Sequence, residues 1–236
     1  MQEPEFHQNR YARELDEVLV DGSRWLDIGA GHGVHHGWIG PSGEDLARRA
    51  GFFAGCDLGS DVLDHPFLHE ARVADASELP WEADTFDLVT ANMVVEHLEQ
   101  PLAVLEEVHR VLKPGGAFLF VTPNLNHPVV RISTIVPKRV RRWYRILVER
   151  AESDDVFPTL YRLNTVQAAE SAAAATGFEV VLAEVFRSTL PVLPSVFGSL
   201  ETLAIGLAVR AGTLKFGSNL IAHLRCRQKS PGYSKL

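Results

Sequence analysis

The sequence predicts an α/β protein with a doubly wound, mostly parallel β-sheet. Short apolar segments that end in polar residues alternate with helical patterns along the chain, and parallel strands need such intervening helices. The first strand segment, Trp25–Ile28, runs into a turn with three alternating glycines. The chain has 236 residues, of which 46% are hydrophobic, so it can bury one substantial core. We therefore expect a single domain over residues 1–236.

The glycine turn indicates a ligand that touches the backbone, because glycine allows positive φ and leaves room where a Cβ would keep a ligand away. Asp27, just before the turn, would repel a pyrophosphate but suits a ligand that carries an ammonium group. A plain chain reversal is one other interpretation. A dinucleotide site is another, although its pattern G-x-G-x-x-G would need a glycine in place of Val34. Before the turn, residues 6–19 are typical of a helix that could bring Tyr11 over the ligand.

Four further strands are expected at 52–57, 72–76, 86–92 and 117–122. Each is an apolar run that ends in polar residues, and the carboxyl ends of parallel strands meet at one edge of a sheet. Asp57 stands where a nucleoside ligand would present its ribose hydroxyls, although an acid at this point is also typical of a turn or an N-cap.

A helix is expected from Glu99 on, between the last two of these strands. Its apolar residues recur at intervals of three and four and should form one buried face. They are Leu98, Leu102, Leu105, Val108 and Leu112. Gly115 and Gly116 follow at the position of a C-terminal cap.

The last third of the chain predicts one more helix and two strands. Asn164 and Gln167 make a capping box for an alanine-rich helix that stops at Gly177. Strands are expected at 178–186 and 220–227. The long link between them contains an apolar stretch, 196–209, which should form an added helix.

Between about residues 24 and 124 the chain resembles the class I S-adenosylmethionine-dependent methyltransferases, in the branch that includes the ubiquinone and menaquinone methyltransferases. The matching residues, in the family's order, are Leu26–Gly33, Asp57, Asp75-Ala76 with Leu79-Pro80, Asp84–Val89, Glu96-His97-Leu98 and Leu112–Gly116. Their joint order is far more specific than any single motif. The interval from Asp27 to Asp57 is longer than the roughly 20 residues usual in nucleotide-binding βαβ units.

The resemblance implies a Rossmann-like fold with a seven-stranded, mostly parallel sheet, in which the last two strands form an antiparallel hairpin at the edge. It implies a cofactor-binding core at about 20–124 and helical insertions on the acceptor side at about 125–163 and 187–217. It also implies S-adenosylmethionine as the cofactor. The residues expected to bind it are Asp27, Gly29, Ala30, Gly31, Gly33, Asp57, Leu58, Asp75, Ala76 and Asn92.

We expect His97 to act as the general base for a hydroxyl acceptor, because an imidazole titrates near neutral pH. Glu96 could orient the ring or contribute acidity, and both residues could instead only begin the next helix. Tyr161 and Arg162 resemble segments that lie over the acceptor pocket, where an arginine can hold a carboxylate or phosphate. Packing and surface charge are the alternative roles for this pair.

The predicted function is therefore methyl transfer from S-adenosylmethionine to an oxygen of a small, glycan or lipid-linked acceptor. N- or C-methylation is an alternative, and so is a catalytically silent module that binds the cofactor and acts through partners. A nicotinamide dehydrogenase is a third possibility, which Val34 disfavours.

Residues 138–150 contain six basic residues and one acidic residue, a local charge of +5 in a chain whose net charge is −7. Trp143 and Tyr144 fall at helical spacing opposite that charge. Such a helix can lie on an anionic membrane surface or hold an anionic substrate, but an ordinary surface helix has the same pattern.

The overall composition disfavours several other classes. A net charge of −7 argues against general nucleic-acid binding. Two cysteines without paired spacing indicate neither a disulfide framework nor a zinc site, and His32, His35 and His36 lack accompanying ligands, so we expect no metal. The acidic N-terminus has no apolar core, and no run of about 18 apolar residues occurs. We expect a cytoplasmic protein, with peripheral contact to the inner face of the membrane if the basic segment binds lipid.

Overall fold

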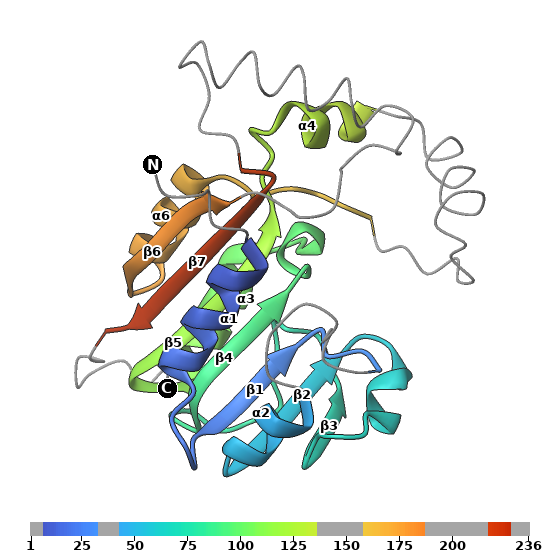
Figure 1. Cartoon of the computed structure of the whole chain (residues 1–236), viewed down its shortest axis with the longest axis vertical. Coiled ribbons are helices and arrows are strands. Elements are labelled where there is room, and N and C mark those ends of the chain that lie inside the picture. Colours follow the sequence, from blue (N-terminus) through green and yellow to red (C-terminus); the bar gives the residue numbers. More distant parts are fainter. Residues whose placement is uncertain (1–6, 33–42, 136–157, 187–216, 228–236) are drawn as a thin grey trace.

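The computed structural model describes residues 7–32, 43–135, 158–186 and 217–227. Within them, seven strands form one sheet in the order β3-β2-β1-β4-β5-β7-β6 (Figure 1). The strands are β1 Arg24–Ile28, β2 Phe52–Asp57, β3 Glu70–Val73, β4 Phe86–Asn92, β5 Leu112–Pro123, β6 Phe178–Phe186 and β7 Asn219–Cys226. Strands β1 to β5 pair in parallel, and β7 pairs antiparallel with both β5 and β6. The predicted doubly wound sheet and its antiparallel hairpin are confirmed.

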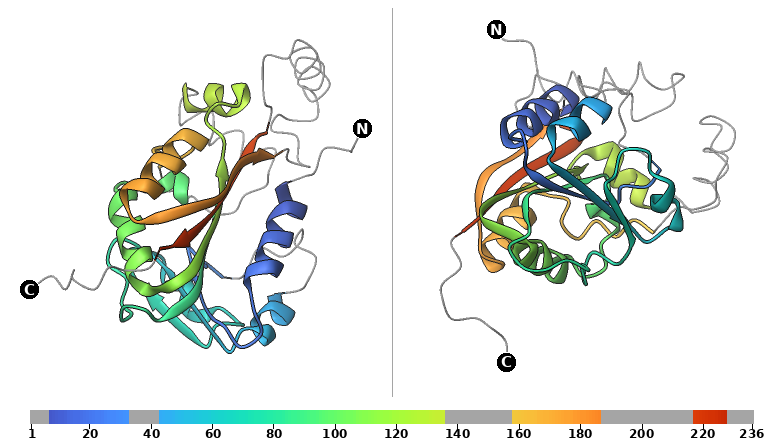
Figure 2. Two further views of the ribbon diagram at one scale, coloured as in Figure 1. Left: turned by 90° about the vertical axis from the view of Figure 1, so that its left-hand side faces the viewer. Right: turned by 90° about the horizontal axis from the view of Figure 1, so that it is seen from below.

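Helices cover both faces of the sheet. They are α1 His7–Val18, α2 Gly43–Arg49, α3 Pro101–Val111, α4 Pro128–Ile135 and α6 Val166–Ala175, with short 3₁₀ turns η1 Ser60–Asp64 and η2 Val95–His97. Figure 2 shows α1 and α2 on one face of the sheet and α3 and α6 on the other.

The two faces of the sheet hold two apolar clusters because successive strand residues point to opposite sides. In β1, Trp25 packs with the residues of α1 and α2, where its ring stacks on Phe53 at 4.0 Å between centroids. Leu26 and Ile28 belong to the cluster beneath α3 and α6. Both helical layers therefore pack on the same short central strand.

A buried hydrogen bond between a histidine and a glutamate also fastens α1 to the sheet. Nδ1 of His223, on β7, lies 2.9 Å from Oε2 of Glu14, and both side chains are buried. Arg10 pairs with the same carboxylate and lies over the ring of Phe186. These contacts hold the N-terminal helix against the antiparallel strands β7 and β6.

Three local predictions around α3 and β3 are wrong. Strand β3 ends at Val73, so Asp75 lies in the loop that follows. Helix α3 ends at Val111 and runs directly into β5, so Gly115, at φ +83°, turns the chain within β5 and does not cap the helix. Leu102 is 50% exposed, because the buried stripe of α3 is centred on Val104, Val108 and Val111.

The capping residue of the alanine-rich helix also differs from the prediction by one position. Oγ1 of Thr165 accepts a hydrogen bond from the N–H of Ala168 at 3.1 Å, which makes Thr165 the N-cap. Asn164 is instead fully buried and donates to Oγ1 of Thr122. Gly177, at φ +86°, follows the helix as expected.

Several predictions fall on residues that the structure does not describe. They concern Gly33, His35, His36, the basic stretch 138–150 and the apolar stretch 196–209. Among the described residues, no helix combines the length and the apolar character that crossing a membrane requires.

Candidate functional site

A cavity of about 450 Å³ lies at the carboxyl ends of the central strands. Its walls come from the residues that follow β1, β2, β3 and β4, together with the start of α3 and the segment at Pro158–Leu160. Seven of the residues predicted for the site line it, namely Gly29, Asp57, Leu58, Asp75, Ala76, Asn92 and His97.

The glycines of the turn after β1 have different roles. Gly29 has φ +73°, and a Cβ there would lie 2.2 Å from Cγ2 of Val94, so this glycine permits close packing against the segment after β4. Gly31 has φ +51°, and a Cβ there would meet no atom of the described residues within 4 Å. Gly31 does not itself line the cavity, but its N–H is bonded to Asp57, which does, so a ligand at Asp57 can approach the bare backbone of this turn.

Asp57, at the end of β2, joins this turn to the next loop. Its Oδ2 accepts a hydrogen bond from the N–H of Gly31 at 3.1 Å, and its Oδ1 accepts one from the N–H of Gly59 at 2.9 Å. Each carboxylate oxygen can accept a second hydrogen bond. The carboxylate is thus held in place by the backbone and can still accept from ligand hydroxyls.

The carboxylate of Asp27 is oriented by a buried hydroxyl on the neighbouring strand β4. Oγ1 of Thr90, on β4, lies 2.6 Å from Oδ1 of Asp27 and 2.8 Å from Nε1 of Trp25, and it also pairs with the phenol of Tyr11. The Thr90 hydroxyl donates to Oδ1 of Asp27 and accepts from the indole N–H of Trp25. The Thr90 side chain therefore fixes the direction of the Asp27 carboxylate.

Tyr11 does not lie over the cavity, and that prediction is wrong. The ring is 3% exposed and packs in the apolar cluster beneath α1 and α2. Its hydroxyl reaches Thr90, because α1 lies flat on the sheet and turns its apolar face inward.

Burial raises the pKa of Asp27 from its ordinary value of 3.8 to about 7, against the lowering effect of the Thr90 hydrogen bond, and the nearby Asp57 carboxylate adds to the rise. The Asp27 carboxyl is 8% exposed and does not itself line the cavity. A cationic ligand above it would favour the ionised form.

The last residue of β4 brings an unpaired polar atom to the site. Asn92 lines the cavity, and its buried Oδ1 has no hydrogen-bond partner among the described residues. Such an atom is costly unless something donates to it. The next residue, Met93, has φ +56°, a strained conformation for a side chain of this size. An acceptor that needs a donor, at the wall of a cavity, fits a ligand with N–H groups.

His97 lines the cavity from η2, and its Nδ1 lies 3.2 Å from the carbonyl oxygen of Pro158. A carbonyl can only accept, so Nδ1 carries the proton of this contact. In the neutral ring, Nε2 is then the nitrogen with the lone pair.

Glu96 lies behind the cavity wall and does not line it. Its side chain is 5% exposed, and its Oε2 accepts from Oγ1 of Thr122 at 2.9 Å. Its carbonyl oxygen accepts from the N–H groups of Leu160 and Tyr161, at 2.7 and 3.1 Å. Burial raises the pKa of the Glu96 carboxyl. Glu96 thus attaches the 158–161 segment to the end of β4.

Tyr161 and Arg162 lie beside the cavity and do not line it. Tyr161 has φ +53°, and the guanidinium of Arg162 donates to the carbonyl oxygen of Glu99. Their neighbours Pro158 and Leu160 do line the cavity, and no local pattern in the sequence marks them. Thr90 was also missed, although a hydroxyl inside a buried strand is a signal that could have identified it.

A family model described as a methyltransferase domain matches residues 4–183 of this chain. Among curated relatives, a ubiquinone biosynthesis O-methyltransferase of Neisseria meningitidis serogroup A is 31% identical over 148 residues, which cover 54% of this chain and 58% of that protein. The enzyme of the same name from Hahella chejuensis is 34% identical over 122 residues, 48% of each chain. The chain thus spans about half the length of the curated relatives it matches.

The fold is similar to that of solved methyltransferase structures. A putative methyltransferase from Bacillus halodurans has a TM-score of 0.57 at 16% identity, over 92% of this chain and 99% of that one. An S-adenosylmethionine-dependent methyltransferase from Mesorhizobium loti has a TM-score of 0.55 at 20% identity, over 90% and 96% of the two chains. At these identities the likeness is one of fold.

The raised pKa of Asp27 predicts that Asp27→Asn stabilises the protein at neutral pH. An acid whose pKa is raised by folding favours the folded state below its unfolded pKa, and this contribution is lost as pH rises from about 4 to about 7. Asparagine keeps an oxygen for the Thr90 hydroxyl and has no proton to lose. We expect the variant to gain about 2–4 kcal/mol over the natural protein between pH 4 and pH 8, measured by urea unfolding. The same difference at both pH values would contradict the prediction.

Proposed function

Because this chain belongs to the class I S-adenosylmethionine-dependent methyltransferases, whose cofactor is S-adenosylmethionine, we propose that the cavity at the carboxyl ends of the strands is the cofactor site of an O-methyltransferase. The observation that carries this proposal is that the oriented carboxylate of Asp57 and the unpaired oxygen of Asn92 line one cavity, and that the turn at Gly31 is hydrogen-bonded to Asp57. Gly31 provides backbone that a ligand can approach, Asp57 provides an acceptor for ligand hydroxyls, and Asn92 provides an acceptor for ligand N–H groups.

The strand order suggests how the cofactor would lie. Moving outward along the sheet, the strand ends are those of β4 and β1, then β2, then β3. The ammonium end would lie near Asn92 and above Asp27, the ribose at Asp57, and the base beyond it at Asp75 and Ala76. Gly29, Ala30 and Leu58 would complete the contacts, and Gly33 remains a proposed contact outside the described residues.

When bound, the cofactor supplies an electrophilic methyl group on a sulfonium. The protein must then align the acceptor oxygen with that group and take up its proton. We propose His97 for the second task, since its Nδ1–H is held by the Pro158 carbonyl and its Nε2 can accept the proton. Glu96 would be a positioning residue, whose backbone carbonyl oxygen holds the Pro158–Tyr161 segment in place.

Oxygen is the proposed acceptor atom because the curated relatives are O-methyltransferases by name. The acceptor is a small molecule, proposed to be free, glycan-linked or lipid-linked, with Tyr161 and Arg162 at its side of the cavity. N- or C-methylation and a silent cofactor-binding module are the alternatives, and the labelling experiment below distinguishes the silent module.

Gly31→Ala should weaken binding of S-adenosylhomocysteine at least tenfold, because it places a side chain beside the proposed cofactor. Gly115→Ala is the matched control, since Gly115 also has positive φ and also has open space around its Cβ, but lies in β5 away from the cavity. Both variants should lose similar stability, about 1 kcal/mol or more. Calorimetry with S-adenosylhomocysteine and with NAD measures the affinities. Equal affinity of both variants for S-adenosylhomocysteine, or preferential binding of NAD, would contradict the proposed site.

His97→Ala should reduce methyl transfer at least tenfold while leaving S-adenosylhomocysteine affinity nearly normal. The assay follows the methyl label from S-adenosylmethionine into lipid and sugar extracts. Unchanged transfer would show that His97 is structural. Binding of S-adenosylhomocysteine without labelling of any fraction by the natural protein would favour the silent module.

We further propose peripheral membrane contact through the basic stretch 138–150, because each basic residue near an anionic surface contributes about 1 kcal/mol. The natural protein should sediment with anionic vesicles at low salt and be released at high salt. Glutamate at the three positions Arg139, Arg141 and Arg142 should abolish sedimentation. A control with the same charge change replaces the exposed residues Arg48, Arg72 and Arg227. Loss of sedimentation in both variants would indicate a general charge effect and contradict a specific membrane segment.

A further inference from the structure

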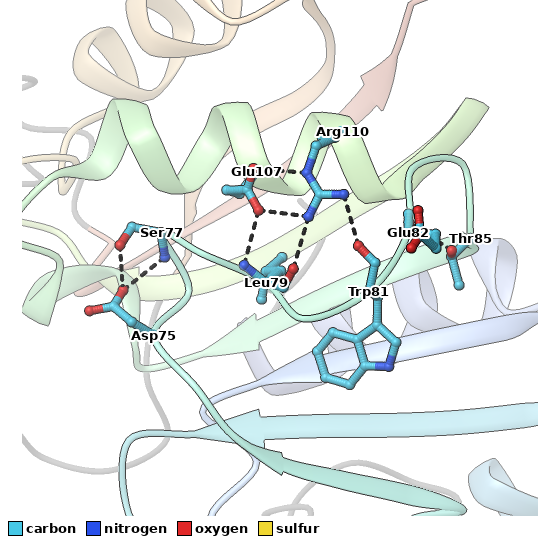
Figure 3. A network of polar contacts seen from close by, with 8 residues as sticks. All are labelled: Asp75, Ser77, Leu79, Trp81, Glu82, Thr85, Glu107 and Arg110. Carbon is cyan, nitrogen blue, oxygen red and sulfur yellow. Dashed lines mark hydrogen bonds and ion pairs between the residues drawn. The ribbon is translucent and has the colours of Figure 1, made fainter. Parts of the chain in front are cut away.

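Two side chains of α3 hold the loop between β3 and β4, as Figure 3 shows. Arg110 donates from Nη1 to the carbonyl oxygen of Trp81 at 2.8 Å and from Nη2 to that of Leu79 at 2.9 Å. Oε2 of Glu107 accepts from the N–H of Leu79 at 3.0 Å. The two side chains also pair with each other, at 2.7 and 2.8 Å. We call Glu107 and Arg110 the loop clamp.

The first part of the clamped loop is a wall of the cavity. Residues 74–77 line it, and Oδ1 of Asp75 accepts from both the N–H and the hydroxyl of Ser77, at 2.8 and 2.7 Å. Leu79, two residues further on, is buried, and both of its backbone polar groups end on the loop clamp. The N–H of Ala74 donates to the carbonyl oxygen of Asp57 at 2.9 Å at the start of this wall, and α3 holds the chain just beyond its other end.

The same helix also carries the facing wall. Leu98, Glu99 and Gln100 line the cavity just before α3 begins at Pro101, and Val104 lines it from the first turn. One rigid helix thus fixes both the segment that bears His97 and, through the loop clamp, the segment that bears Asp75. The spacing of these two walls depends on the contacts between α3 and the loop.

The loop clamp positions the loop and contributes little to the free energy of folding. Its side chains are partly exposed, 37% for Arg110 and 21% for Glu107, and exposed pairs of this kind contribute little to folding. The hydrogen bond from Arg110 lowers the pKa of Glu107, so the pair stays charged at neutral pH. A planar guanidinium can reach two carbonyls and a carboxylate at once, which a lysine ammonium on its flexible stem cannot do in the same arrangement.

We propose that Glu107 and Arg110 are positioning residues for S-adenosylmethionine, which hold residues 74–77 where the base end of the cofactor binds. This inference rests on the proposed cofactor site. It predicts an effect on cofactor affinity with little effect on the rate at saturating cofactor, since neither side chain is among the residues that line the cavity.

The test compares Arg110→Gln and Arg110→Lys with Arg48→Gln. Arg48 is a matched control because it also pairs with carboxylates on its own helix, Glu44 and Asp45, but lies on α2 away from the cavity. By calorimetry, Arg110→Gln should weaken S-adenosylhomocysteine binding at least tenfold and Arg110→Lys several-fold, while Arg48→Gln stays within twofold. In labelled-methyl assays, KM for S-adenosylmethionine should rise and kcat should stay within twofold.

Glu107→Gln provides a milder variant in case Arg110→Gln does not fold. Hydrogen exchange of the Leu79 amide should then become faster, and the affinity should fall with it. A folded clamp variant with faster exchange and normal affinity would overturn the proposal. Failure of the natural protein to bind S-adenosylhomocysteine in the same experiment would instead overturn the cofactor site itself.

Discussion

The reversal of strand order at β1 is the constraint on which the rest of the site depends. The chain leaves β1 for β2 and β3 on one side and returns to β4 and β5 on the other, so the connecting helices cover opposite faces and leave a crevice where they diverge. The strand register then decides which residues lie next to one another at the site. Asp27 of β1 lies opposite Thr90 of β4 and Gly55 of β2, and a slip of one residue in β4 would turn Thr90 to the other face of the sheet, away from Asp27.

The site concentrates features that cost folding energy. Among the described residues, positive φ at a position other than glycine occurs at Asp84, Met93 and Tyr161. Met93 lines the cavity, and Tyr161 comes directly after Leu160, which also lines it. Asp84 lies in the loop before β4, where its N–H donates to the carbonyl oxygen of Arg110 on α3. A buried carboxyl and an unpaired amide oxygen lie on the same edge of the sheet. Strain and unsatisfied polar groups of this kind persist only where the surrounding structure holds them in place.

Local patterns in the sequence were sufficient for the glycine turn and for most of the strands, though not for the end of β3, because apolar runs and glycine spacing act over a few residues. They failed where the answer depends on partners far along the chain. The adjacent residues Asn164 and Thr165 are both capable caps, and only contacts with β5, some 40 residues earlier, decide that Asn164 turns inward. Tyr11 is likewise buried in the apolar cluster under α1 and α2, with its hydroxyl near Thr90 of β4. Nothing near Tyr11 in the sequence indicates this.

The cavity is built from two separate parts of the chain. The strand ends and the clamped loop, on the proposed cofactor side, come from residues 24–111, whereas Pro158 and Leu160, on the proposed acceptor side, come from the end of the first insertion. That segment is held by the backbone of Glu96, by the ring of His97 and, through Asn164, by Thr122. Because the Glu96 contacts use its carbonyl oxygen, side chains in the segment can change without loss of these bonds. Such an arrangement would let the proposed acceptor pocket vary in shape while His97 stays fixed relative to the proposed cofactor site.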